Sequence, residues 1–237
     1  MYKNELLNLL KHENRLVFTT AGISQLIGLK GPSLSNLLES MVRQGYLGSI
    51  SKGRYYFKGA QIRDVFAIAS KIVSPSYIGT ESAFERYGLS DVIPKIIRVI
   101  TTRAHRPIKT NEGKITFIRF KKERFFGYNE SRWISISSLE KAFVDSLYLG
   151  EFPFFTDLVN YHSKLENFGY RLDCDRLVEY ALRMKSDALA NRVGFFLEHV
   201  GEGDYSARLL SHTYRKRRIP ADHSGQGSFD SKKWMIE

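Results

Sequence analysis

Near the start of the chain, the spacing of hydrophobic residues is first typical of helices and then typical of strands. From Thr19 to Gly28 the apolar side chains lie on one face of a short helix that starts at a threonine cap. From Leu34 to Val42 they recur at i, i+3, i+4, i+7 and i+8, which predicts a second amphipathic helix. Two β-prone runs, Tyr46 to Ile50 and Arg54 to Phe57, then flank the turn residues Ser51-Lys52-Gly53. This order predicts a winged helix-turn-helix.

A second, longer region begins after Gly59, and in it most strand-like runs precede most helices. The runs that predict strands are Ile96–Thr102, Ile115–Phe120, Phe125–Tyr128 and Trp133–Ile136. The segments that predict helices are Lys3–Lys11 in the first region and Ala60–Val73, Thr80–Tyr87, Ser138–Leu149, Phe155–Asn167, Asp173–Met184 and Ser186–Val200 in the second. Grouped strands and helices are typical of α+β domains rather than doubly wound nucleotide-binding folds. We therefore expect an α+β protein with two domains, a winged helix over residues 1–59 and an α+β domain over residues 60–237.

The outward face of the second predicted helix carries small polar side chains suited to DNA. Hydroxyl and amide groups near a helix N-terminus can approach base edges in the major groove, and asparagine pairs well with adenine. Basic residues before the helix, at its end and on the hairpin are placed for the phosphate backbone. The candidates are Ser33, Ser35 and Asn36 for bases and Lys30, Arg43, Lys52 and Arg54 for phosphates. A solvated polar face on a helix pair without a DNA role is the alternative interpretation.

The charge balance favours a polyanionic partner. Lys and Arg number 36 against 25 Asp and Glu, which gives a formal net charge of +11. The excess is concentrated between Lys95 and Arg132. In that region, the basic residues of the predicted strand Ile115–Phe120 lie at its C-terminal end. A possible secondary basic surface comprises Arg103, Arg106, Lys109, Arg119, Lys121, Lys122 and Arg124, together with Arg215, Lys216, Arg217 and Arg218 near the C-terminus. Both groups could instead be solvated charges at a strand edge or in a loop.

The sequence offers little support for an enzyme. The only cysteine, Cys174, excludes an internal disulfide, and the six histidines show no paired metal spacing. Glu112-Gly113-Lys114 resembles half of a nuclease motif whose second carboxylate would come from Asp91 or Glu81, but it is more simply a hairpin turn. We expect no catalytic residue, no cofactor and no metal. No signal peptide or membrane span is evident, so we expect a cytoplasmic protein.

After the predicted winged helix the chain carries, in order, Tyr77 to Leu89, Val99 to Thr102, Ser137 to Asp145, Asn191 to Glu198 and Lys233-Trp234. This succession of segments resembles the AbiEi family of antitoxins from type IV toxin-antitoxin systems. Ser137 to Asp145 is similar to the family's helix with a Glu-Lys-Ala pattern. Asn191 to Glu198 is similar to its later Arg-x-Gly helix, and Lys233-Trp234 to its C-terminal tryptophan segment.

The resemblance implies an antitoxin that also represses its own operon. Its DNA partner would be double-stranded promoter DNA with repeated sites, bound by a protein that is a monomer in solution or self-associates weakly on DNA. Its functional partner would be an AbiEii-like nucleotidyltransferase toxin encoded next door, countered without a stable complex. The alternative is a one-component regulator whose second domain senses a small molecule. The 16 Phe and 13 Tyr residues could line its pocket, or they could fill a core.

Overall fold

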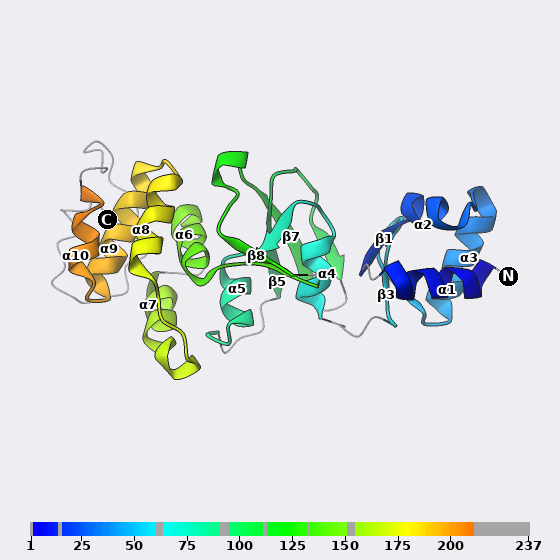
Figure 1. Cartoon of the computed structure of the whole chain (residues 1–237), viewed down its shortest axis with the longest axis horizontal. Helices are drawn as coiled ribbons and strands as arrows, with labels where there is room; N and C mark the ends of the chain where they lie inside the picture. Colours follow the sequence, from blue (N-terminus) through cyan, green and yellow to red (C-terminus); the bar gives the residue numbers. More distant parts are fainter. Residues whose placement is uncertain are drawn as a thin grey trace.

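The protein has a mixed α+β fold arranged as three blocks along its long axis. The computed structural model describes residues 2–13, 16–59, 64–90, 95–110, 113–131, 133–150 and 155–210. In Figure 1 an N-terminal block of helices and a small sheet lies at one end, a larger sheet lies in the middle, and a group of helices lies at the other end. The predicted α+β class is confirmed at this level.

The N-terminal block packs three helices on a three-stranded antiparallel sheet. Its elements are α1 (Tyr2–Glu13), β1 (Val17–Thr19), α2 (Thr20–Ile27), α3 (Gly31–Arg43), β2 (Leu47–Ser51) and β3 (Arg54–Phe57). The strand order is β1-β3-β2. Leu6, Ile23, Leu38 and Met41 are completely or almost completely buried between the helices, as the helical periodicity predicts. The three predicted helices and the hairpin are therefore confirmed, whereas β1 was not predicted.

The central block is a six-stranded mixed sheet with the order β6-β7-β5-β4-β9-β8. Its strands are β4 (Ser76–Ile78), β5 (Ile96–Thr101), β6 (Ile108–Thr110), β7 (Gly113–Arg119), β8 (Tyr128–Glu130) and β9 (Ser135–Ser137). The pairs β5/β7 and β4/β9 are parallel, and the other neighbours are antiparallel. β5 and β7 match two predicted strands closely, but β8 and β9 lie slightly later than predicted. β4 and β6 were not predicted.

Helix α4 (Val65–Lys71) joins the first two blocks. An amphipathic helix buries one face, but in α4 five consecutive residues from Phe66 to Ser70 are buried. One side of α4 faces β4 and β5, and the same apolar cluster also includes Leu16 and Ile50 from the N-terminal block. A helix that is covered on opposite sides buries nearly all of its surface, which explains the difference. Residues 60–63 of the predicted helix lie outside the described part.

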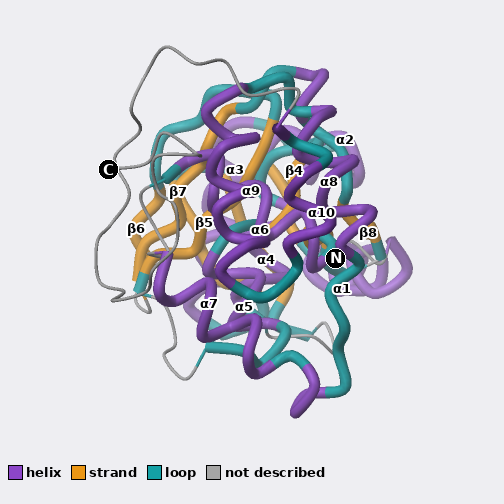
Figure 2. Tube along the Cα trace, turned by 90° about the vertical axis from the view of Figure 1, so that its left-hand side faces the viewer, coloured by secondary structure: helices purple, strands orange, loops and turns teal. Residues whose placement is uncertain are grey.

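The remaining helices lie beyond the opposite face of the sheet. They are α5 (Glu81–Arg86), α6 (Leu139–Leu149), α7 (Phe155–Lys164), α8 (Cys174–Arg183), α9 (Asp187–His199) and α10 (Gly203–Ala207), with short 3-10 turns at Lys122–Arg124 (η1) and Glu166–Phe168 (η2). The first two of them, α5 and α6, pack against the strands of the sheet. Figure 2, seen from this end, shows the helices stacked in front of the strands. The rings of Phe84, Phe143 and Phe196 lie about 5 Å apart in successive pairs, so these aromatic side chains form a packed core.

A buried ion pair lies where α6 packs against the sheet. The ammonium group of Lys141 donates to Asp145 Oδ1 one turn later, and both side chains are 0% exposed. The hydroxyl of Tyr77, on β4, donates to Asp145 Oδ2 at 2.9 Å. Burial lowers the pKa of Lys141 and raises the pKa of Asp145, and the attraction between the two charges opposes both shifts. The sequence predicts this helix but not the burial of the two charges.

Candidate nucleic-acid interface

The turn between α2 and α3 is fixed by local hydrogen bonds. Thr19 caps α2, because its Oγ1 accepts from the backbone N–H of Gly22 at 3.0 Å. Gly28 ends α2 in the left-handed conformation (φ 69°) and donates to Ser24 O, and the Ser24 hydroxyl donates to Leu29 O at 2.9 Å. Only residues 28–30 separate the helices. The orientation of α3 relative to α2 is thus set by the sequence of the turn itself.

α3 exposes the polar face that the sequence analysis singled out. Its inner face buries Leu34, Leu38 and Met41 against the N-terminal core. The predicted contact residues Lys30, Ser33, Ser35, Asn36 and Arg43 are all exposed. In Figure 1 the helix lies at the end of the molecule, away from the central sheet, so no other block covers this face.

The N-terminal half of α3 is better suited to an anion than the C-terminal half. Lys30 occupies the N-cap position, and no side chain accepts a hydrogen bond there. The N–H groups of Gly31 and Ser33 and the positive end of the helix dipole are therefore available to an anion, whereas Pro32 between them has no N–H. Glu39, further along the helix, is also exposed and would repel phosphates. The start of α3, with Ser33 and Asn36, therefore lacks the negative side chain that the later part of the exposed face carries.

The β2–β3 hairpin is short and is anchored to α2. Ser51 pairs with Arg54 across the turn residues Lys52 and Gly53, and Gly53 adopts a positive φ of 73°. The carbonyl of Gly53 accepts from the N–H of Thr20 at 2.9 Å, so the turn lies against the start of α2. Lys52 is exposed beside it, as the predicted phosphate contact requires.

Arg54 is placed differently from the prediction. Its side chain is half-buried, and its guanidinium contacts Nε2 of His105, in the loop after β5. The His105 ring in turn packs on Phe117, with 4.5 Å between ring centroids. Arg54 therefore links the hairpin to the central block instead of standing free at the hairpin tip. The periodicity of the hairpin could not reveal this contact, since the partner lies 51 residues away.

Five of the predicted secondary basic residues lie at or beyond the C-terminal ends of two neighbouring strands of the central sheet. β5 and β7 are parallel, so their C-terminal ends lie side by side, where Phe120 N–H donates to Thr101 O at 2.8 Å. The exposed basic residues at or beyond these strand ends are Arg103, Arg106, Arg119, Lys121 and Lys122, and Lys109 is exposed on the neighbouring edge strand β6. The contact between His105 and Arg54 joins the loop after β5 to the hairpin.

Arg124, which was predicted to belong to the basic surface, binds a neighbouring helix instead. Arg124 is half-buried and donates from Nε to Met184 O at 2.8 Å, from Nη2 to Lys185 O at 3.2 Å and to the hydroxyl of Tyr148. It satisfies carbonyls at the end of α8, so its assignment to an exposed basic surface was wrong. Arg215, Lys216, Arg217 and Arg218 lie outside the described residues.

The described side chains do not form the metal site that the nuclease alternative requires. The Glu81 carboxylate contacts Arg98 and accepts from the Thr80 hydroxyl at 2.7 Å. Asp91 and Glu112 are outside the described residues, but β6 and β7 pair antiparallel on either side of residues 111–112, as the hairpin interpretation predicted. Within the described ranges, no group of three or more His, Cys, Asp or Glu residues could hold a metal ion.

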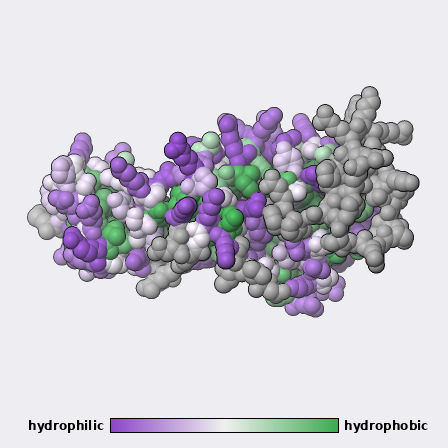
Figure 3. Space-filling model, turned by 180° about the vertical axis from the view of Figure 1, so that it is seen from behind, coloured by the Kyte–Doolittle hydropathy of each residue, from purple (hydrophilic) through white to green (hydrophobic). Residues whose placement is uncertain are grey.

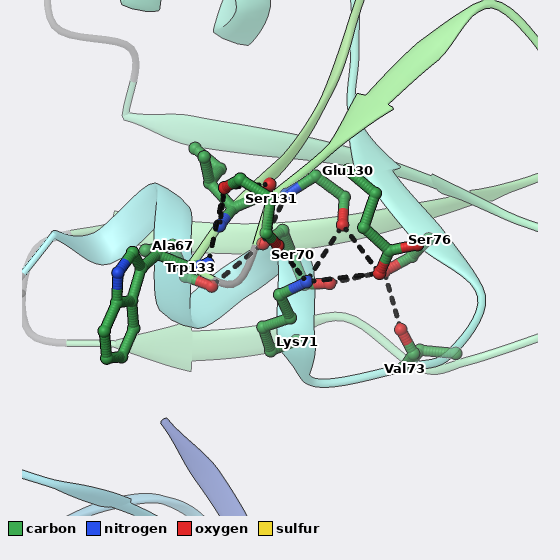
Figure 4. Close-up of polar contacts among 10 residues, drawn as sticks. Ala67, Ser70, Lys71, Val73, Ser76, Glu130, Ser131 and Trp133 are labelled. Atoms are coloured by element: carbon green, nitrogen blue, oxygen red, sulfur yellow. Dashed lines mark hydrogen bonds and ion pairs between the residues drawn. The ribbon is translucent and has the colours of Figure 1, made fainter. Parts of the chain in front are cut away.

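A serine and lysine network near α4 serves packing. Lys71 donates to Glu130 Oε1, Ser131 O and Ser135 Oγ at 3.1–3.3 Å, which ties the end of α4 to the β8–β9 turn (Figure 4). The Ser76 hydroxyl donates to Ser70 O at 2.8 Å in the same network. Although Ser135 is close to an amine, it is only 2% exposed and its N–H donates to Ser70 Oγ. The Ser135 hydroxyl is therefore a buried member of this network.

The comparisons with known proteins show the fold alone. No protein-family model and no curated protein sequence matches this chain. A similar solved structure is the crystal structure of the RV2827C protein from Mycobacterium tuberculosis. The match has a TM-score of 0.64 at 16% sequence identity and covers 99% of this chain and 90% of that chain. The similarity therefore extends over all three blocks. Among the described helices, none is both long and apolar enough to cross a membrane.

Proposed function

We propose that the N-terminal block is a winged helix-turn-helix that binds double-stranded DNA with α3 in the major groove. The observation that carries the proposal is the geometry of α3, which has an uncapped and exposed N-terminus behind a short fixed turn. The order of helices and strands, with the sheet order β1-β3-β2, supports the winged form. The net charge of +11 supports a polyanionic partner.

In this proposal Ser33, Ser35 and Asn36 contact bases, and Lys30, Arg43 and Lys52 contact phosphates. Arg54 acts indirectly, because it fixes the hairpin to the loop that carries Arg103 and Arg106. The basic residues at the ends of β5 and β7 extend the electrostatic attraction beyond the hairpin.

The biological role that we propose is that of an antitoxin that represses its own operon. This part rests on the resemblance to the AbiEi family. Ser137 to Asp145 spans the end of β9 and the start of α6, and Asn191 to Glu198 lies in α9, which packs on α6. Both segments are largely buried, so they support a shared fold and do not define the surface that counters the toxin. We propose an AbiEii-like nucleotidyltransferase as the functional partner.

DNA protection tests the proposed binding mode. The purified protein should protect repeated sites upstream of its own gene, and the double variant Asn36→Ala/Lys52→Ala should lose most of that protection. Both side chains are exposed, so the double variant should remain folded. An absence of protection by the wild-type protein, or unchanged affinity in the double variant, would refute the assigned roles. Mg²⁺-dependent cleavage of the DNA that is abolished by Glu112→Ala would establish the nuclease alternative instead.

Repression and toxin neutralisation should be separable in the full-length chain. We expect Lys30→Ala/Asn36→Ala to abolish repression of the operon but to retain neutralisation of the toxin encoded by the adjacent gene. A reporter fusion and a growth assay measure the two activities. Deletion of the N-terminal block is a poorer test, because it uncovers the apolar side of α4. Loss of both activities in a variant that is folded and as abundant as the wild-type protein would contradict the assignment of repression and neutralisation to different parts of the chain.

A further inference from the structure

A cavity lies where the N-terminal block meets the central block. Its volume is about 870 Å³, which falls in the range of small-molecule sites. One wall comes from α1, β2, β3 and the residues after β3, and the other comes from α4, β6 and β7. The lining residues are Leu7, Lys11, Gly45, Tyr46, Ser49, Ile50, Tyr56, Phe57, Lys58, Gly59, Val65, Ile68, Lys109 and Ile115.

The lining combines an apolar surface with positive charge. Ile50, Ile68 and Ile115 are buried at its base. Lys11, Lys58 and Lys109 contribute the charged groups of the lining, which includes no acidic side chain among the described residues. Positive groups around an apolar hollow favour an anionic ligand. Figure 3 shows green apolar surface next to purple hydrophilic side chains over the middle of the molecule.

Part of one wall of the cavity is the ring of Tyr56, which the backbone at Gly48 on the paired strand holds in place. The Tyr56 ring lies over Gly48 on the paired strand, so closely that a Cβ atom at Gly48 would stand 2.0 Å from a ring carbon. Any side chain at position 48 would therefore displace the ring. Tyr46 lines the same cavity and is 38% exposed. Two aromatic rings beside an apolar base offer a flat organic group a large contact area.

We infer that this cavity binds a small organic anion with an aromatic or otherwise apolar body. The apolar body would lie against Ile50, Ile68 and Tyr56, and its carboxylate, sulfonate or phosphate would face the lysines. Such a ligand would bridge both blocks and would bias the orientation of the β2–β3 hairpin relative to the central sheet. This cavity is not the pocket that the sensor alternative places among the Phe and Tyr residues of the second domain. In the helical block, aromatic residues pack on one another as a core.

Fluorescence titration of the full-length protein with 8-anilinonaphthalene-1-sulfonate tests this inference. We expect saturable binding of one probe per chain, with the affinity reduced about tenfold or more in Lys58→Ala/Lys109→Ala. Val65→Glu, which adds a carboxylate to the lining, should weaken binding similarly, whereas Val65→Met should retain it. Lys122→Ala is the matched control, because Lys122 is exposed but does not line the cavity, and it should leave the affinity unchanged.

The control experiments decide between this cavity and nonspecific binding. Circular dichroism and thermal melting establish that each variant is folded, since the probe also binds partly unfolded proteins. No saturation, binding of several probes per chain, unchanged affinity in Lys58→Ala/Lys109→Ala, or an equal loss in Lys122→Ala would each overturn the inference. The titration contains no DNA, so its failure would leave the proposed DNA-binding function untouched.

Discussion

Replacement of Lys141 by methionine should lower the free energy of unfolding by about 3–5 kcal/mol. The substitution keeps a long side chain but leaves the Asp145 carboxylate without its cation, and both positions are 0% exposed. Tyr77 would remain as a hydrogen-bond donor to Asp145, and one neutral donor does not compensate a buried charge. Urea unfolding followed by circular dichroism measures the change.

Two comparisons would establish that the loss comes from the buried charge. The triple variant Lys141→Met/Asp145→Leu/Tyr77→Phe removes the ion pair and the hydroxyl that depends on it, and it should recover most of the stability. The exposed pair Arg208–Asp175, with side chains 52% and 69% exposed, provides the matched control. Arg208→Met should cost less than about 1 kcal/mol. A cost for Lys141→Met as small as that of Arg208→Met would contradict the structural role of the pair.

The elements that sequence reasoning identified are those long enough to show a period. α3 has 13 residues, and its apolar stripe is visible in the sequence because Leu34, Leu38 and Met41 repeat on one face. β4 has only three residues, all buried, so no alternation between two faces could reveal it. Its position near the centre of the sheet follows from pairing with β5 and β9, which are distant in sequence.

The sequence predicts which side chains of the candidate site are exposed where they lie on one helix. It does not predict the contacts that side chains make with remote segments. The exposure of Ser33 and Asn36 follows from the period of α3 alone. The positive charge of Arg54 and Arg124 alone predicted that both side chains stand free at the surface. In the fold each has a partner in a remote segment. The i, i+4 spacing of Lys141 and Asp145 was visible, but spacing alone does not distinguish a buried pair from an exposed one.

The salt dependence of DNA binding should separate the phosphate contacts from the base contacts. Lys30→Ala and Lys52→Ala should each weaken binding to operator and unrelated DNA alike. Each should also reduce the slope of log K against log salt concentration by about one. Asn36→Ala should cost about 1–3 kcal/mol at the operator, leave binding to unrelated DNA nearly unchanged and keep the slope. Fluorescence anisotropy at several salt concentrations gives all of these quantities.

The control for this series is a cation at the other end of the molecule. Arg171 precedes α8 and is exposed, and in Figure 1 α8 lies at the end opposite α3. Arg171→Ala makes the same change in net charge as Lys30→Ala, but it should leave the slope unchanged, because a distant charge releases no counterions from bound DNA. Equal slopes for Lys30→Ala and Arg171→Ala would mean that the net charge of the protein, rather than the end of α3, carries the attraction. An unchanged operator preference in Asn36→Ala would assign sequence discrimination to another part of the surface.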